Sequence, residues 1–217
     1  MNDADLWADQ LEALGDLAAS SVLDITQGER LEEIASDLLR DAPERFALAG
    51  FSLGGYVALE IARQAPERIE RLALLDTCIK PDSSERAAQR REMNRIALSP
   101  GTFHGFGERL LDTYLHPTNR SNAEIVERIR GMTQRLGPEI FVRQNSLERK
   151  DGTTILAALK CPVLVICGDS DRLTPLADHL EMVTIAQDAH LVVIHQSGHM
   201  TPLEQPGEVT RALRRWM

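Results

Sequence analysis

The chain has 217 residues and a formal net charge of -9, with 43% hydrophobic and 26% charged residues. This length allows one domain with a full core, or a core that carries an inserted subdomain. The negative charge argues against nucleic acid as a partner, because neutralising phosphates requires a basic face, and it argues equally against an anionic membrane surface. A small-molecule substrate is not excluded.

Three cysteines (Cys78, Cys161 and Cys167) make an odd count without the spacing of a metal site, and we expect them to be free thiols. No stretch approaches the roughly 20 apolar residues of a membrane span. The first twenty residues are acidic and contain no apolar secretion core. These features predict a cytoplasmic protein.

The first part of the chain alternates predicted helices with short apolar strands. Trp7, Leu11 and Leu14 lie at helical spacing, and residues 21–26 and 45–50 read as buried strands. Between these two strands a second apolar stripe recurs at helical spacing, formed by Leu31, Ile34, Ala35, Leu38 and Leu39.

The run Gly50-Phe51-Ser52-Leu53-Gly54-Gly55 joins the second of these strands to a predicted helix. A serine at so sharp a turn takes strained backbone angles, and side chains two residues to either side would collide, so we expect glycine to be required at both Gly50 and Gly54. The turn lifts the Ser52 hydroxyl out of the sheet at a helix N-terminus. There the amide of Leu53 can face a developing oxyanion.

A third strand is predicted at residues 71–76, and the pattern then changes between residues 81 and 159. This stretch has no convincing strand and consists of helical fragments rich in arginine and glutamate. We interpret residues 81–159 as a helical cap inserted into a core formed by residues 1–80 and 160–217.

Two more strands, at residues 162–167 and 190–195, are each followed by a polar loop. The first loop contains Asp169 and Asp171, and the second contains His199. Continuous apolar strands separated by amphipathic helices predict an α/β fold with a doubly wound, mostly parallel sheet. A serine hydroxyl needs a base and an orienting carboxylate to become a nucleophile, and these loops supply candidates for both.

The order serine, acid, histidine along the chain resembles that of the α/β-hydrolase superfamily, particularly its small cofactor-free esterases and lactonases. The resemblance spans nearly the whole chain, including the cap, and implies an N-terminally shortened member. It implies that Ser52 is the nucleophile, Asp171 the orienting acid and His199 the base, with no cofactor and no metal. The matching motifs are Gly50-Phe51-Ser52-Leu53-Gly54-Gly55, Gly168-x-x-Asp171 ending in Thr174-Pro175, and Ser197-Gly198-His199 with Glu204-Gln205-Pro206 beyond.

Each assignment has a rival. Asp169 could be the acid, although it more plausibly shapes the turn, and Asp76 is a third choice because some family members place the acid after that strand. His195 ends an apolar strand, where a histidine is more often a satisfied core residue. A metal held by His195 and His199 is disfavoured, since their spacing crosses from strand to loop. The remaining histidines are expected to be surface or packing residues: His104, His116, His179 and His190.

Family members have strands ahead of position 3, and one of them would normally separate residues 21–26 from residues 45–50. An open slot would leave buried backbone groups unpaired at about 1–3 kcal/mol each. We therefore expect either direct pairing of these two segments or a strand donated by a second copy, which would make a homodimer. Met1 or Asn2 supplies a second oxyanion amide only if the N-terminus folds over Ser52.

The leading functional hypothesis is a serine hydrolase that cleaves a small carboxylic ester or lactone through an acyl-enzyme. The alternative is a catalytically weak or inactive ligand-binding protein of the same fold, because the oxyanion loop is missing.

Overall fold

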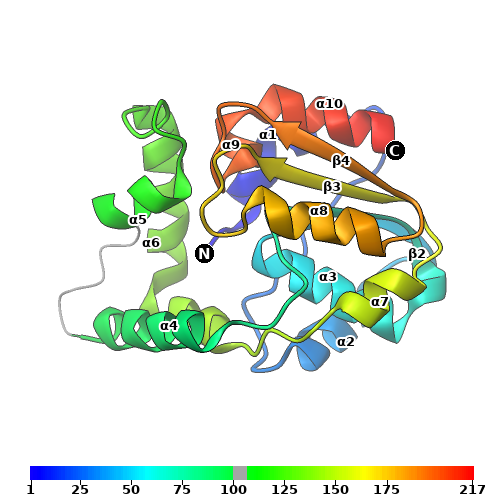
Figure 1. Cartoon of the computed structure of the whole chain (residues 1–217), viewed down its shortest axis with the longest axis horizontal. Coiled ribbons are helices and arrows are strands. Elements are labelled where there is room, and N and C mark those ends of the chain that lie inside the picture. Colours follow the sequence, from blue (N-terminus) through cyan, green and yellow to red (C-terminus); the bar gives the residue numbers. More distant parts are fainter. Residues whose placement is uncertain (100–106) are drawn as a thin grey trace.

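A computed structural model of the chain describes residues 1–99 and 107–217 (Figure 1). Within these residues four strands form one parallel sheet in the order β1-β2-β3-β4. The predicted α/β class with a parallel sheet is thereby confirmed. The strands are β1 (Phe46–Phe51), β2 (Ile69–Leu75), β3 (Val163–Gly168) and β4 (Ala189–Ile194).

Helices connect the strands and lie on both faces of the sheet. Short 3-10 turns, η1 (Ala4–Trp7) and η2 (Pro66–Arg68), precede α1 and β2. The helices are α1 (Ala8–Leu14), α2 (Leu31–Asp41), α3 (Leu53–Gln64), α4 (Ser84–Ala97), α5 (Glu108–Tyr114), α6 (Ala123–Ser146), α7 (Thr153–Ala158), α8 (Leu176–Ile185), α9 (Thr201–Glu204) and α10 (Pro206–Trp216).

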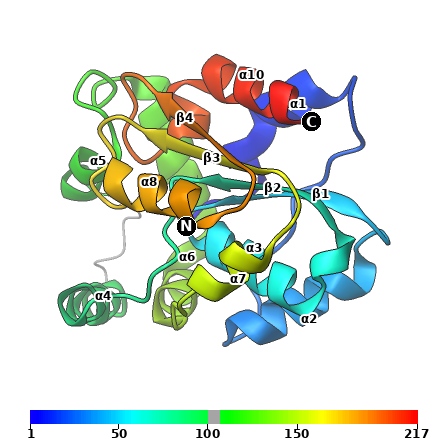
Figure 2. The same ribbon diagram turned by 45° about the vertical axis from the view of Figure 1, so that its right-hand side comes forward.

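Successive side chains of each strand enter two different cores, as the pleat of a strand requires. Leu72 and Leu74 of β2 pack with α2, α3 and α7, whereas Ala73 and Leu75 pack with α1, α9 and α10. Figure 2 shows the sheet between these two layers. Because both faces are covered, β3 is buried at every position, which explains its uninterrupted apolar sequence.

The segment 21–26 is not a strand, contrary to the prediction. Residues 18–25 have no regular secondary structure, and Val22 and Leu23 are 36% and 38% exposed. A strand needs a neighbouring strand to pair its backbone groups, and this segment pairs with none of the described strands. The expected direct pairing of this segment with β1 is therefore wrong, and β1 forms an edge of the described sheet.

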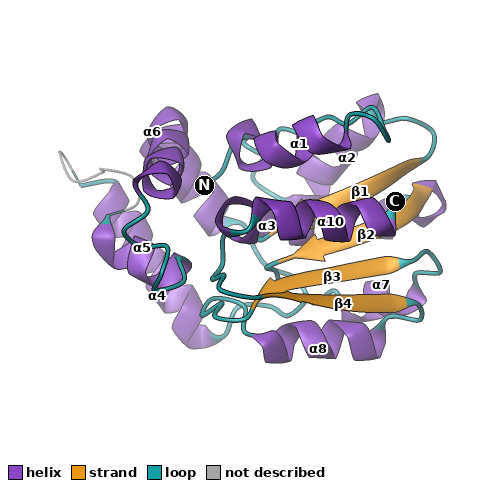
Figure 3. Cartoon of the chain, turned by 90° about the horizontal axis from the view of Figure 1, so that it is seen from above, coloured by secondary structure: helices purple, strands orange, loops and turns teal. Residues whose placement is uncertain are grey.

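Helices α4, α5 and α6 lie beyond the carboxyl ends of the strands, on the side where the chain begins (Figures 1 and 3). Helix α6 contains a kink at Gly137, where φ is 74°, immediately before Pro138. Helix α7, by contrast, packs near α3 and α8 through Leu156 and Leu159. Within the segment expected to form a cap, the part that faces the strand ends is therefore α4 to α6.

Candidate active site

Ser52 sits at the turn between β1 and α3, with φ 51° and ψ -115°. These angles lie in a region that side-chain-bearing residues rarely adopt, so the surrounding structure must hold them. The Ser52 amide donates a hydrogen bond of 2.9 Å to the Leu75 carbonyl oxygen at the end of β2. The serine is thus fixed to the sheet while its hydroxyl projects from the sheet edge.

The glycines of the turn do not have equal roles. A Cβ at Gly50 would lie 2.4 Å from the carbonyl oxygen of Gly54, so this position must be glycine, as predicted. A Cβ at Gly54 would meet no atom within 4 Å, and the predicted requirement for glycine there is wrong. The second constrained glycine is Gly55, where a Cβ would lie 2.3 Å from the hydroxyl oxygen of Thr77.

Three side chains meet at the carboxyl ends of β1, β3 and β4. The His199 Nε2 atom lies 3.0 Å from Ser52 Oγ, and its Nδ1 atom lies 2.8 Å from Asp171 Oδ2. The imidazole of His199 is only 2% exposed. It therefore connects a serine to a carboxylate in a site that is largely shielded from water.

Asp171 is held by the turn that precedes α8. Its Oδ1 atom accepts hydrogen bonds from the amides of Leu173 and Thr174, and its Oδ2 atom accepts one from the Thr174 hydroxyl at 2.7 Å. Burial alone would raise the pKa of Asp171, but the His199 charge and these hydrogen bonds lower it to about 2. Asp171 is therefore an ionised carboxylate aimed at the imidazole.

The neighbouring acid Asp169 makes a different set of contacts. Its Oδ2 atom accepts a hydrogen bond from the Gln196 amide at 3.1 Å and lies 3.3 Å from His195 Nδ1. The His195 side chain is 87% exposed, so the interpretation of His195 as a core histidine is wrong. Asp169 and His195 link two loops at the surface and do not contact Ser52.

Asp76, the third candidate acid, is fully buried at the end of β2. Its carboxylate accepts hydrogen bonds from the Gly168 amide and from the amide and hydroxyl of Thr201. Burial and the nearby Asp171 charge raise the pKa of Asp76 well above its usual range. Asp76 thus ties together the loops that carry the other two groups, and it does not orient His199.

The sequence interpretation missed several groups around the imidazole. Phe51 and Tyr114 pack against the His199 ring, with centroid distances of 5.4 and 5.2 Å. The His199 amide donates a hydrogen bond of 2.7 Å to the Tyr114 carbonyl oxygen. Glu204 accepts hydrogen bonds from the residues on either side of His199. Phe51 and Glu204 both stood in quoted motifs, but nothing in the sequence indicated which residues they contact.

The remaining histidines do not join this site. His179 is fully buried in α8, whereas His116 and His190 are at least partly exposed. His104 lies outside the described residues. No group of three or more histidine, cysteine or acidic side chains is arranged to hold a metal in the part of the chain that the structure describes.

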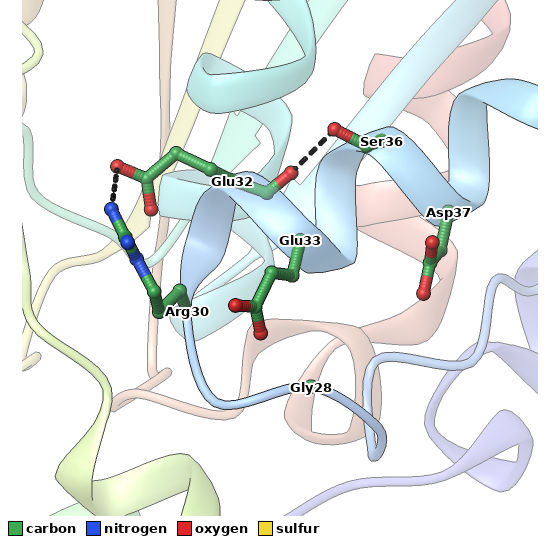
Figure 4. A pocket seen from close by; sticks show the side chains of 6 residues that line it. All are labelled: Gly28, Arg30, Glu32, Glu33, Ser36 and Asp37. Carbon is green, nitrogen blue, oxygen red and sulfur yellow. Dashed lines mark hydrogen bonds and ion pairs between the residues drawn. The ribbon is translucent and has the colours of Figure 1, made fainter.

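Two surface hollows lie away from Ser52. One is at the start of α2 and presents carboxylates, with Glu32 bound to Arg30 and Ser36 bonded to the Glu32 backbone (Figure 4). The other lies over the amino ends of β2, β3 and β4, the opposite edge of the sheet. Neither combines a nucleophile with a base.

Among the described residues no helix has both the length and the apolar character needed to cross a membrane.

Comparison with known proteins places these residues in a family context. Residues 3–212 match the Alpha/beta hydrolase family. A curated relative from Vibrio campbellii, a pimeloyl-[acyl-carrier protein] methyl ester esterase, is 28% identical over 198 residues, which cover 81% of this chain and 74% of the relative.

Solved structures show the same likeness. A thermophilic esterase from Thermogutta terrifontis, determined with malate bound, is 32% identical and superposes with a TM-score of 0.85, covering 99% of this chain and 85% of the other. A hydrolase from Pseudomonas aeruginosa is 27% identical with the same TM-score and coverage. An enol-lactonase from Burkholderia xenovorans, at 20% identity and a TM-score of 0.80 over 99% of this chain and 86% of that one, shares the fold.

Proposed function

The chain belongs to the alpha/beta hydrolase family, and from this premise we propose that it cleaves esters, with Ser52 as the nucleophile, His199 as the base and Asp171 as the orienting acid. The proposal rests on an unbroken series of contacts from Ser52 through His199 to Asp171. His199 Nε2 is 3.0 Å from Ser52 Oγ, while Nδ1 of the same ring is 2.8 Å from Asp171 Oδ2. These distances are within reach of proton transfer and of tautomer control.

The reaction follows from this arrangement. His199 takes the proton of Ser52 as Oγ attacks the ester carbonyl, and Asp171 holds the Nδ1–H tautomer and stabilises the imidazolium. His199 then gives its proton to the leaving alkoxide, which leaves an acyl group on Ser52. A water molecule, deprotonated by the same imidazole, hydrolyses the acyl-enzyme and restores the serine.

The oxyanion of the tetrahedral intermediate is assigned to the amide of Leu53. Leu53 is the first residue of α3, so its N–H has no acceptor within the helix. This N–H lies at the positive end of the helix dipole, which favours negative charge. Met1 packs against the core cluster that contains Phe51, the residue before Ser52. This placement supports a second N–H donor, either the Met1 amino group or the Asn2 amide.

We propose a small carboxylic ester as the substrate, with lactones as a related class. The curated relative is named as a methyl ester esterase and the 32%-identical structure as an esterase, and both support this choice. We also propose that residues 81–159 form the cap of the enzyme and that α4 to α6 cover Ser52. The arrangement of these helices beyond the strand ends supports the assignment (Figure 3).

A fluorophosphonate probe and a panel of p-nitrophenyl esters of increasing acyl length test the proposal. We expect wild-type protein to be labelled on Ser52 and to cleave the short esters. The Ser52→Ala variant should lose labelling and at least about 10⁴-fold of kcat, since removing a triad member leaves only residual catalysis. Folded wild-type protein that is neither labelled nor active would instead support the ligand-binding alternative.

A further inference from the structure

A buried carboxylate outside the triad connects the catalytic histidine to the cap. We propose that Glu204 is a positioning residue. Its carboxylate holds the loop of His199 and the α5–α6 connection in a fixed relative position, and this places the imidazole over Ser52. The inference rests on the proposed function, because it assumes that His199 is the base. Glu204 is the last residue of α9 and is 6% exposed.

One oxygen of Glu204 holds both sides of the histidine. Its Oε1 atom accepts hydrogen bonds from the amide of Gly198 at 2.8 Å and from the amide of Met200 at 3.2 Å. These residues immediately precede and follow His199. The backbone on either side of the imidazole is therefore tied to a single atom.

The other oxygen holds the α5–α6 connection. Its Oε2 atom accepts hydrogen bonds from the His116 amide and from the Asn119 side-chain amide, both at 2.8 Å. The end of α5, where this connection begins, approaches the histidine loop directly: the His199 amide donates to the Tyr114 carbonyl oxygen, and a Cβ at Gly198 would lie 2.5 Å from that oxygen. A shift of the cap segment would therefore move His199.

The donors around Glu204 explain why a carboxylate is required. Both of its oxygens face N–H groups, and a carboxylate accepts on both while donating nothing. A glutamine of the same shape would turn its NH₂ group either toward Gly198 and Met200 or toward His116 and Asn119. In either orientation one pair of buried donors loses its acceptor, which is costly away from water.

Glu60 offers a matched control for this substitution. It is 5% exposed in α3, and its carboxylate accepts hydrogen bonds from Arg63 and Gln64 of the same helix. This helix does not carry the histidine loop. Glu60→Gln therefore makes the same chemical change at a similar burial and removes an ion pair. It should cost stability without moving the imidazole.

The experiment compares Glu204→Gln with Glu60→Gln in the full chain. Three quantities are measured: the free energy of unfolding in urea, kcat and KM for the best ester, and the low-field proton NMR resonance of the His199 Nδ1–H. We expect Glu204→Gln to lower kcat by about 10- to 100-fold, because misplacement of a catalytic group by about 1 Å has that effect. KM should change little, and the low-field resonance should shift or broaden. Glu60→Gln should keep both kcat and the resonance.

A Glu204→Gln protein that is destabilised like Glu60→Gln but retains kcat and the resonance would overturn the proposal. Ser52→Ala and His199→Ala are measured in the same assay. If those two variants stay active, the proposed function fails; if they are inactive while Glu204→Gln is fully active, only the present inference fails.

A cap-side variant keeps the test decisive even if Glu204→Gln does not fold. Asn119→Ala removes one donor to Oε2 and should lower kcat several-fold. In the double variant the two losses should be less than additive, because both substitutions act on one hydrogen-bond network. An Asn119→Ala protein with wild-type kcat, or losses that multiply independently, would show that the cap is not coupled to His199 through Glu204.

Discussion

The unequal roles of the glycines at the nucleophile turn give a sharp prediction for Gly50→Ala. The added Cβ would lie 2.4 Å from the Gly54 carbonyl oxygen, 2.7 Å from the Gly54 carbonyl carbon and 2.8 Å from the Gly55 nitrogen. All three are backbone atoms, so no side-chain rotation can relieve the contact. Restoring an ordinary contact distance of about 3.5 Å requires the strand and helix to separate by about 1 Å.

Two consequences can be measured. Overpacking of this kind costs about 1–3 kcal/mol of stability, and a displacement of about 1 Å at Ser52 costs about 100-fold in kcat. Gly54→Ala is the control, because its Cβ meets nothing within 4 Å. Replacing a helical glycine with alanine should stabilise the protein by up to about 1 kcal/mol.

The assay pairs urea unfolding with hydrolysis of a p-nitrophenyl ester for both variants and the wild type. The reasoning is refuted if Gly50→Ala matches the wild type in both stability and kcat. It is equally refuted if Gly54→Ala is destabilised as strongly as Gly50→Ala, since the difference in available space would then have no effect.

Further predictions concern the acid and a buried histidine. Asp171→Asn should lower kcat by about 10⁴-fold, because the amide no longer enforces the Nδ1–H tautomer of His199; a loss below about tenfold on the ester panel would contradict its assignment as the orienting acid. The pKa of Asp171 is lowered from 3.8 to about 2, so its ionised form stabilises the folded state above about pH 4. This stabilisation is lost as the pH falls toward 2. The corresponding fall in the free energy of unfolding should be absent when Asp171→Asn is unfolded in urea over the same pH range. Burial lowers the pKa of His179 to about 4 from 6.5, so the unfolded state binds more protons between these values and the free energy of unfolding should fall by up to about 3 kcal/mol as pH drops from 6.5 to 4. A His179→Met variant should lose this slope, and a slope that persists unchanged would exclude His179 as its source.

The sheet was predictable where local sequence and tertiary structure agree. Strands β1 to β4 were predicted because strands covered on both faces need continuous apolar residues, and each of these runs is bounded by turn residues. The segment 21–26 has the same local character, but strand propensity does not supply a pairing partner, and this segment pairs with none of the described strands.

The three proposed catalytic residues could be predicted from the sequence, but the residues that hold them in place could not. Spacing along the chain placed Ser52, Asp171 and His199 on loops at one sheet edge, and their side chains meet there. Contacts that cross the fold left no trace in sequence. The side chain that excludes a Cβ at Gly55 belongs to Thr77, beyond the end of β2, and the partners of Glu204 lie up to 88 residues away.

The strand that presents Ser52 is also the open margin of the described sheet. One row of peptide groups on β1 has no ladder partner among the described strands, and Ala47 and Ala49 are exposed there without a charge to repel an incoming chain. A polypeptide that aligned itself along this margin would stiffen the backbone immediately preceding the nucleophile. Backbone pairing at this edge would therefore act directly on the turn that presents Ser52.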